Sequence, residues 1–169
     1  MTMQTIDFRL HHIVRYCGLE RGNAFAVSFE ETFHKIKGIE KLLQLNPRFY
    51  GWCYFGKIHS MYLYSDYDYE EWLEIQNLRM VMESEDKEYR MTLFFRDVTS
   101  FYLAQSAGIS GFEIECSDDH AFGDRRNFHV FDFEEGDIRF YCREIEIEEV
   151  VNREMIKRKE EGGLAYHGD

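Results

Sequence analysis

The polar segment 117–124 has a composition suited to catalysis in this chain of 169 residues. Asp118 and Asp119 directly precede His120, and Asp124 follows shortly after. Carboxylates beside an imidazole are the groups that general acid–base catalysis uses. A solvated turn has the same composition, and we favour that interpretation. The alternative that stays open is a small enzyme or ligand-binding domain that uses Asp118, Asp119 and His120.

Three further motifs for chemistry are incomplete. The segment Asp66-Tyr67-Asp68 has the D-x-D spacing with which some sugar-nucleotide enzymes hold a divalent cation, but the pattern is short. The segment Gly108-Ile109-Ser110-Gly111 lacks the last glycine of a G-x-S-x-G nucleophile elbow, because Phe112 stands there. Asp97 with Glu113-Ile114-Glu115 is loosely similar to metal-dependent nucleases, without their catalytic lysine. None of these motifs identifies a reaction.

The histidines and cysteines lack metal-binding spacing. His11 and His12 are adjacent, so their side chains diverge on a helix or a strand, and the other histidines show no H-x-x-x-H pattern. The cysteines are widely separated, without a C-x-x-C pair, and we predict free thiols: Cys17, Cys53, Cys116 and Cys142. We therefore expect no metal and no cofactor, and we favour a protein without catalytic activity.

The negative charge is concentrated in one part of the chain. The formal net charge is −12, and residues 64–88 hold nine acidic and two basic side chains, a local balance of −7. Residues 1–47 are nearly neutral, with five acidic and six basic side chains. This distribution argues against nucleic acid or an anionic membrane as a partner, because both would be repelled. It permits a basic protein partner, although acidic surfaces also keep proteins in solution.

Tyrosines and a tryptophan alternate with carboxylates between Tyr62 and Glu74, a stretch that we name the acidic aromatic surface. Aromatic side chains supply large contact areas in interfaces, and carboxylates speed the encounter with a basic partner. The sequence predicts the following protein-binding residues: Tyr64, Asp66, Tyr67, Asp68, Tyr69, Glu70, Glu71 and Trp72. The alternative is that these tyrosines cover a sheet edge with their hydroxyl groups in water.

The stretch from Tyr89 to Val150 is built mainly from strands. Apolar residues alternate with polar ones over 89–95 and 112–116, and residues 128–142 form two β-rich runs around an acidic turn, which predicts a hairpin. Residues 57–64 and 98–103 also have strand character. With both faces largely apolar, 57–64 is expected between the sheet and the helices, and 65–71 is expected to be a connection. The inward parity changes near Arg143-Glu144, which predicts a bulge.

Helices are expected at both ends of the chain. Residues 5–17 fit either a helix or a strand, and we favour the helix. A capping box at Ser28 starts a second helix that ends at Asn46-Pro47 and contains Gly38, a mark of close packing. The charged segment 149–169 predicts a short helix with a tail. The fold class is therefore α+β, with an antiparallel sheet of hairpins over residues 49–148 packed with N-terminal helices and a short C-terminal helix.

We expect a single domain over residues 1–169, divided into a helical segment (1–47), a β-rich core (48–148) and a charged C-terminal helix and tail (149–169). The start of the chain has no readable secretory signal and no apolar run is long enough to cross a bilayer, so a cytoplasmic location is expected. A homodimer through sheet edges or aromatic patches is compatible with each of these interpretations.

Two segments carry a resemblance to known proteins. Residues 91–103 with 108–114, and residues 128–147, resemble the C-terminal halves of small bacterial proteins of uncharacterised function, some of which are similar to immunity proteins of polymorphic toxin systems. The likeness covers roughly Tyr54 to Glu148 and lies in the spacing of the strands. It implies an antiparallel β-rich domain and a cytoplasmic inhibitor that blocks its partner by occlusion. With the acidic charge, the expected partner is a basic toxin or effector.

Overall fold

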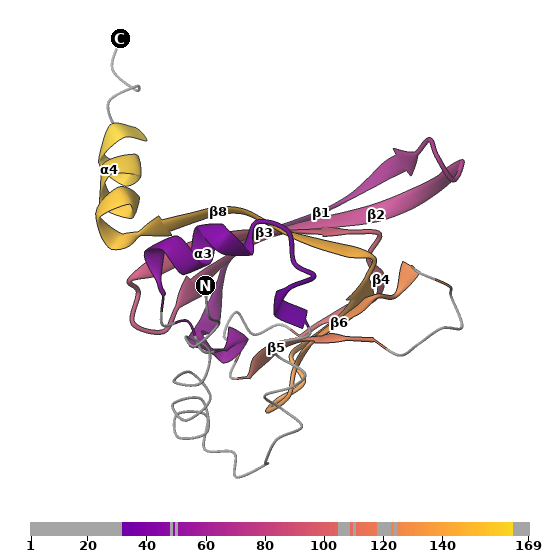
Figure 1. Cartoon of the computed structure of the whole chain (residues 1–169), viewed down its shortest axis with the longest axis horizontal. Helices are drawn as coiled ribbons and strands as arrows, with labels where there is room; N and C mark the ends of the chain where they lie inside the picture. The colour runs from indigo at the N-terminus through magenta and orange to yellow at the C-terminus, as the bar shows by residue number, and fades with distance from the viewer. Residues whose placement is uncertain are drawn as a thin grey trace, which may run out of the picture.

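The computed structural model describes residues 32–47, 49, 51–104, 109, 111–117, 123 and 125–163, with the side chains of 160–163 outside that description. The predicted segment 5–17 and the Asp118, Asp119 and His120 loop lie outside the described residues. The elements follow in this order (Figure 1): α3 (Ile39–Leu45), a 3₁₀ turn η1 (Trp52–Tyr54), β1 (Phe55–Asp68), β2 (Leu73–Ser84), β3 (Tyr89–Arg96), β4 (Thr99–Leu103), β5 (Phe112–Cys116), β6 (Phe128–Asp132), β7 (Ile138–Cys142), β8 (Glu144–Asn152) and α4 (Arg153–Gly163).

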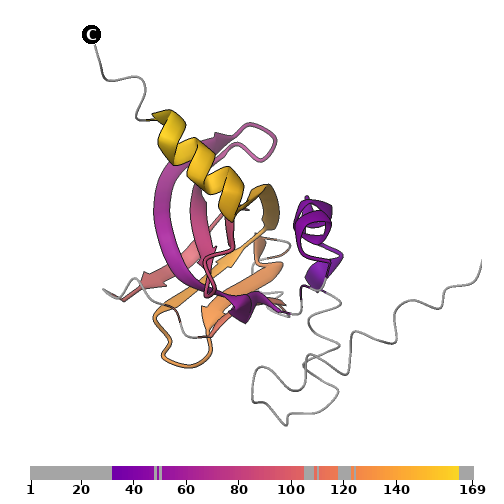
Figure 2. The ribbon, with the colours of Figure 1, turned by 90° about the vertical axis from the view of Figure 1, so that its left-hand side faces the viewer.

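The strands form two antiparallel sheets. The first sheet has the order β1-β2-β3-β8, and the second has the order β4-β7-β6-β5. All the strand pairs within both sheets are antiparallel, including the predicted hairpin, in which Phe128 pairs with Cys142. The α+β class and the antiparallel pairing are therefore confirmed, with the strands divided between two sheets. Figure 2 shows the long strands of the first sheet curving past the shorter strands of the second.

The inner faces of the two sheets share one hydrophobic core. On β3 the alternating residues Met91, Leu93 and Phe95 are completely buried, as their spacing predicts. Phe95 meets Phe140 of β7 edge to face, with 5.0 Å between ring centroids, so the core joins the two sheets. Cys142 is a buried free thiol in this core, and burial raises its pKa well above the ordinary value. Cys53 and Cys116 are also free, as predicted.

The parity change near Arg143 is not a bulge within one strand, so that prediction is wrong. β7 ends at Cys142 in the second sheet, and β8 begins at Glu144 in the first sheet. Cys142 and Ile145 are both buried because each faces the same core from a different sheet. The backbone N–H of Arg143 donates to the carbonyl of Arg96 at 2.9 Å, which fixes the crossing point. The inward parity resets because the chain changes sheets.

The predicted continuous helix up to Asn46 is wrong, because the chain breaks at Lys37-Gly38. Lys37 forms a parallel bridge beside β8, donating to the carbonyl of Ile145 and accepting from the N–H of Ile147. Gly38 then has a φ of +76°, and α3 begins one residue later. A Cβ atom at Gly38 would lie 2.4 Å from the carbonyl oxygen of Ile147, so the predicted close packing at this glycine is confirmed.

The strand expected at 57–64 is longer and lies in a different place. β1 continues to Asp68, so residues 65–68 belong to the strand rather than to a connection. β1 is also an edge strand of the first sheet, and many of its side chains are exposed, so the expected position between sheet and helices is wrong. The apolar residues on both faces of this strand include tyrosines that face water. Apolar and aromatic residues on both faces are thus compatible with an exposed edge strand as well as with a buried strand.

The C-terminal helix is confirmed as α4. Its first turn is capped by Asn152, whose side-chain oxygen accepts the N–H of Met155 at 3.0 Å. Figure 2 shows α4 and α3 as two separate helices beside the sheets. In the described part of the chain, the helices are too short or too polar to span a bilayer.

Candidate protein-binding surface

The β1–β2 hairpin exposes large aromatic side chains, both along β1 and at its tip. Figure 1 shows this hairpin extending beyond the rest of the first sheet. The exposed fractions are 65% for Tyr62, 41% for Tyr67, 75% for Tyr69 and 76% for Trp72. Tyr67 and Tyr69 contact each other edge to face, with 5.0 Å between centroids. The acidic aromatic surface is thus an exposed, protruding part of the fold.

Trp72 has an unusual backbone conformation. It is the last residue of the four-residue turn between Asp68 and Leu73, and its φ is +58°. A left-handed conformation costs a residue with a side chain roughly 1–2 kcal/mol. Because the indole is mostly exposed, packing within the chain offsets little of this cost.

Asp68 holds the turn from inside. It is only 3% exposed, and its Oδ1 accepts the backbone N–H groups of Glu70 and Glu71 at 3.0 and 3.3 Å. Its Oδ2 accepts from Arg96 at 2.9 Å and from Arg143 at 3.4 Å. The hydrogen bond from Arg96, with those backbone N–H groups and the Arg96 charge, outweighs desolvation and lowers the pKa of Asp68. Asp68 therefore holds the neighbouring residues of the turn in place.

Ion pairs tie the turn to the points where the chain changes sheets. Arg143, between β7 and β8, contacts Glu71 at 2.7 Å and Asp97 at 3.2 Å. Asp97, between β3 and β4, is buried and accepts from Arg125 at 2.7 and 2.6 Å. This network restrains the hairpin tip within the free chain.

Basic side chains contact the carboxylates whose spacing in the sequence resembled that of metal ligands. The Asp97 carboxylate lies against two arginines, and Asp68 of the D-x-D segment lies against Arg96 and Arg143. Glu115 in β5 contacts the Nδ1 atom of His129 at 3.1 Å. Within the described residues, no group of three or more histidines, cysteines and carboxylates is arranged to hold a metal ion.

The remaining predicted residues divide into exposed and partly covered ones. Asp66 and Glu70 are exposed, Tyr64 is half-buried, and Glu71 is exposed but paired with Arg143. Tyr64 stacks on Tyr62, with 5.3 Å between centroids. The list of predicted binding residues begins at Tyr64, so it leaves out the exposed Leu63 and also Tyr62, the exposed first residue of the acidic aromatic surface. An edge position for β1 was the missing information, because an edge strand exposes side chains that a central strand buries.

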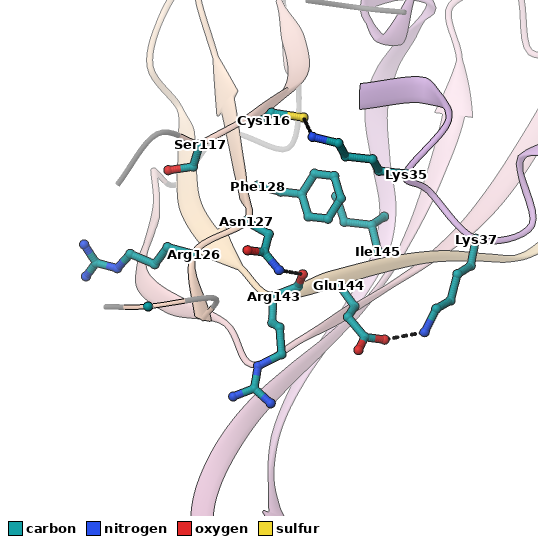
Figure 3. A pocket seen from close by; sticks show the side chains of 11 residues that line it. Lys35, Lys37, Cys116, Ser117, Arg126, Asn127, Phe128, Arg143, Glu144 and Ile145 are labelled. Atoms are coloured by element: carbon teal, nitrogen blue, oxygen red, sulfur yellow. Dashed lines mark hydrogen bonds and ion pairs between the residues drawn. The ribbon is translucent and has the colours of Figure 1, made fainter. Parts of the chain in front are cut away.

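A cavity of about 630 Å³ lies near the β7–β8 crossing (Figure 3), and Arg143, which contacts Glu71 of the hairpin turn, belongs to its lining. Its lining includes basic, polar and apolar side chains: Lys35, Lys37, Cys116, Ser117, Arg126, Asn127, Phe128, Arg143, Glu144 and Ile145, with Gly123. Ser117 and Gly123 stand on either side of the Asp118, Asp119 and His120 loop in the sequence, while that loop itself is outside the described residues.

A family model for "Immunity protein PIM8" matches residues 36–148, about two thirds of the chain. The chain belongs to the PIM8 immunity protein family. This result confirms the resemblance to immunity proteins that the strand spacing indicated. Comparisons with curated proteins and with solved structures found no match.

The PIM8 match includes the elements that build and support the hairpin tip. It begins at Ile36, beside the Lys37 bridge, and ends at Glu148 in β8. Glu148 accepts two hydrogen bonds of 2.7 Å from Arg79 of β2, the strand that returns from the tip. The whole acidic aromatic surface therefore lies inside the matched region, and so does α3, which the sequence resemblance left out.

Proposed function

We propose that this chain acts in the bacterial cytoplasm as a non-enzymatic immunity-type inhibitor of a basic toxin or effector protein. The PIM8 family match supports the inhibitor role. The observation that supports the site is the exposed aromatic cluster at the β1–β2 tip, with Trp72 in a strained conformation at its end. Inhibition follows from occlusion, which requires contact area rather than catalytic groups.

The aromatic residues provide most of the expected binding free energy. Tyrosine and tryptophan dominate protein interfaces because they bury large areas while few rotatable bonds are fixed. Tyr62, Tyr67, Tyr69 and Trp72 are exposed in the free chain, and their hairpin is held by the Asp68 and Arg143 contacts. Such a surface binds without a large rearrangement.

The carboxylates around the aromatic residues select a basic partner. Asp66, Glu70 and Glu74 are exposed near the tip, and water solvates them in the free chain. Opposite charge on a partner increases the association rate and disfavours acidic competitors. Because rim charges are screened by salt, the association should weaken as ionic strength rises.

A capture experiment tests this proposal. The native chain and the Trp72→Ala variant are immobilised separately, exposed to lysate of the source cells at low salt and eluted with a salt step for mass spectrometry. The proposal expects one basic protein in stoichiometric amount on the native chain and its loss from the variant. Co-expression of that protein with the native chain should restore growth if it is toxic alone. Equal capture by both chains, or a captured protein whose toxicity the chain leaves unchanged, would overturn the proposal.

A further inference from the structure

β1 is an edge strand of the first sheet, and part of its outer side has none of the usual protection. Natural proteins protect exposed sheet edges with bulges, lysines or prolines, or cover them with another segment. The start of β1 has two register shifts in its pairing with β2, one before Lys57 and one after Ile58. Residues 60–66, in contrast, pair with β2 in regular register and contain no lysine, arginine or proline. A regular edge of this kind is a template for a further strand.

The opposite edge of the same sheet is covered. The backbone of Lys37 bonds to β8 on that side, and the Nζ atom of Lys41 donates to the carbonyls of Ile147 and Glu148 at 2.8 and 3.1 Å. In the part of the chain that the structure describes, no hydrogen bond reaches the backbone of residues 60–66 from outside the sheet. The two edges of the first sheet therefore differ, and β1 is the open one.

A hydrogen bond on the far side of β2 shows which backbone groups of β1 point outward. Gln76 is the β2 partner of Ser65, and its carbonyl accepts from the N–H of Val98, just beyond β3, at 2.6 Å. Gln76 thus directs its backbone groups away from β1, and Ser65 directs its own away from β2. Because this pattern repeats at every second residue of a regular antiparallel pair, Met61 and Leu63 also direct their N–H and C=O groups outward.

The open stretch ends at Tyr67. This residue follows the same alternation as Ser65, and its N–H donates to the neighbouring Oδ1 atom of Asp66 at 2.8 Å. A side chain of the protein therefore occupies the outward N–H at this end. The groups that stay available to a partner strand are the N–H and C=O of Met61, Leu63 and Ser65.

The surroundings of this edge favour a basic strand over a second copy of the chain. Residues 64–88 hold nine acidic and two basic side chains, and the exposed carboxylates near the tip include Asp66, Glu70 and Glu74. Pairing β1 with β1 of a second copy would bring two acidic hairpins side by side, and like charges on neighbouring strands repel. Lysine or arginine side chains on an added strand would gain from the same carboxylates. The exposed Tyr62 and Leu63, on opposite faces of β1, supply apolar surface for the stems of those side chains.

We propose that β1 binds an extended, basic segment of the partner protein, which adds to the first sheet as a further strand along residues 60–66. Main-chain hydrogen bonds to Met61, Leu63 and Ser65 hold the segment, and the neighbouring side chains select it. This inference rests on the proposed function, because the segment belongs to the same basic partner. It adds a second kind of contact to the aromatic side chains: the partner is held by the backbone of β1 as well as by the tip.

Hydrogen exchange followed by NMR tests this proposal on the full chain, alone and with the partner protein from the capture experiment. In the free chain the N–H groups of Met61, Leu63 and Ser65 should exchange quickly, and those of Tyr62 and Tyr64, which bond to β2, should exchange slowly. Binding of the partner should slow exchange at Met61, Leu63 and Ser65 by at least about tenfold, because each N–H gains an acceptor. Contact through the tip alone would leave these three N–H groups in fast exchange.

Ser65→Pro and Ser65→Ala separate the backbone of this edge from its side chains. Proline lacks the outward N–H, and edge strands tolerate it where that N–H faces water. Ser65→Pro should lose at least about tenfold in affinity for the partner, because an acceptor of the added strand is left unpaired, while Ser65→Ala should keep native affinity. An unchanged thermal transition of Ser65→Pro is the control for its fold. If that variant unfolds, the exchange result on the native chain decides the question.

Two results would overturn strand addition and leave the proposed function intact: native affinity in a folded Ser65→Pro chain, or unchanged exchange at Met61, Leu63 and Ser65 in a complex that neutralises the toxin. Slow exchange at these residues in the free chain, becoming slower as the chain concentration rises, would show a second copy on this edge and would also overturn the proposal. If the capture experiment yields no partner, the proposed function fails and this inference fails with it.

Discussion

Trp72 carries two energetic costs in the free chain, an exposed indole and a left-handed backbone. Glycine at this position removes the backbone strain from the folded state. It also increases the conformational entropy of the unfolded chain, which offsets part of the gain in stability. We expect Trp72→Gly to stabilise the fold by about 0.5–1 kcal/mol in urea unfolding while it abolishes partner binding. Trp72→Ala keeps the strain and should have nearly native stability. Destabilisation by Trp72→Gly would mean that the indole packs against its own chain.

Asp68 links the conformation of the hairpin turn to pH. Its folded-state pKa lies below the ordinary value of 3.8 because of the hydrogen bond from Arg96, supported by the Glu70 and Glu71 N–H groups. The ion pairs of Asp68 therefore stabilise the fold fully above that value and are lost as the pH falls through the folded-state pKa. Asp68→Asn should be less stable than the native chain at neutral pH, and the two stabilities should converge in acid. Parallel curves of unfolding free energy against pH would contradict this account.

At the scale of elements, Gly38 controls how the N-terminal segment meets β8. Gly38→Ala combines the left-handed φ with a Cβ atom 2.4 Å from the Ile147 carbonyl oxygen. Gly136 has nearly the same φ, +72°, but nothing within 4 Å of its Cβ position. Gly136→Ala should therefore cost about 1 kcal/mol from backbone strain alone, and Gly38→Ala should cost at least ~2 kcal/mol in chemical denaturation. Equal losses would show that the close approach at Gly38 relaxes freely.

Local periodicity predicts the strands whose two faces differ. β3 and the β6–β7 hairpin were predicted because one face is buried and the other is not. The sheet change at Arg143 was not predictable, since strands from two sheets alternate toward one core and look like one bulged strand. The break at Gly38 was missed because Lys37 pairs with Glu146, more than a hundred residues away. Long-range pairing leaves no local signal of this kind.

The candidate sites show the same limit. Composition predicted the exposed aromatic tip because Tyr69 and Trp72 lie in a short polar turn. Composition did not distinguish Asp68, which is buried, from its exposed neighbours, because Arg96 and Arg143, which cover it, are distant in the sequence. The cavity near the β7–β8 crossing was not predicted for the same reason, because its lining residues are distant from one another in the sequence. The expectation of a single domain over residues 1–169 stays a prediction, and so does the expectation of a homodimer.

At the scale of the whole molecule, the position of the acidic charge should matter more than its amount. Glu70→Gln with Glu74→Gln removes two exposed charges from the tip, and Glu134→Gln with Glu135→Gln removes two from the β6–β7 turn. We expect the first pair to slow association with the partner and to weaken its dependence on ionic strength. The second pair should behave like the native chain in stopped-flow association. Equal effects of the two pairs would leave only a general role for net charge.

The most direct test of the account is the affinity of the captured partner for the native chain, Trp72→Ala and Tyr102→Ala, measured by calorimetry. Tyr102 is a matched control, because it is an exposed aromatic residue on β4 of the second sheet. We predict that Trp72→Ala loses at least about 2 kcal/mol of binding free energy, roughly thirtyfold in affinity, and that Tyr102→Ala retains native affinity. Native affinity in Trp72→Ala, or a larger loss in Tyr102→Ala, would contradict binding through the acidic aromatic surface.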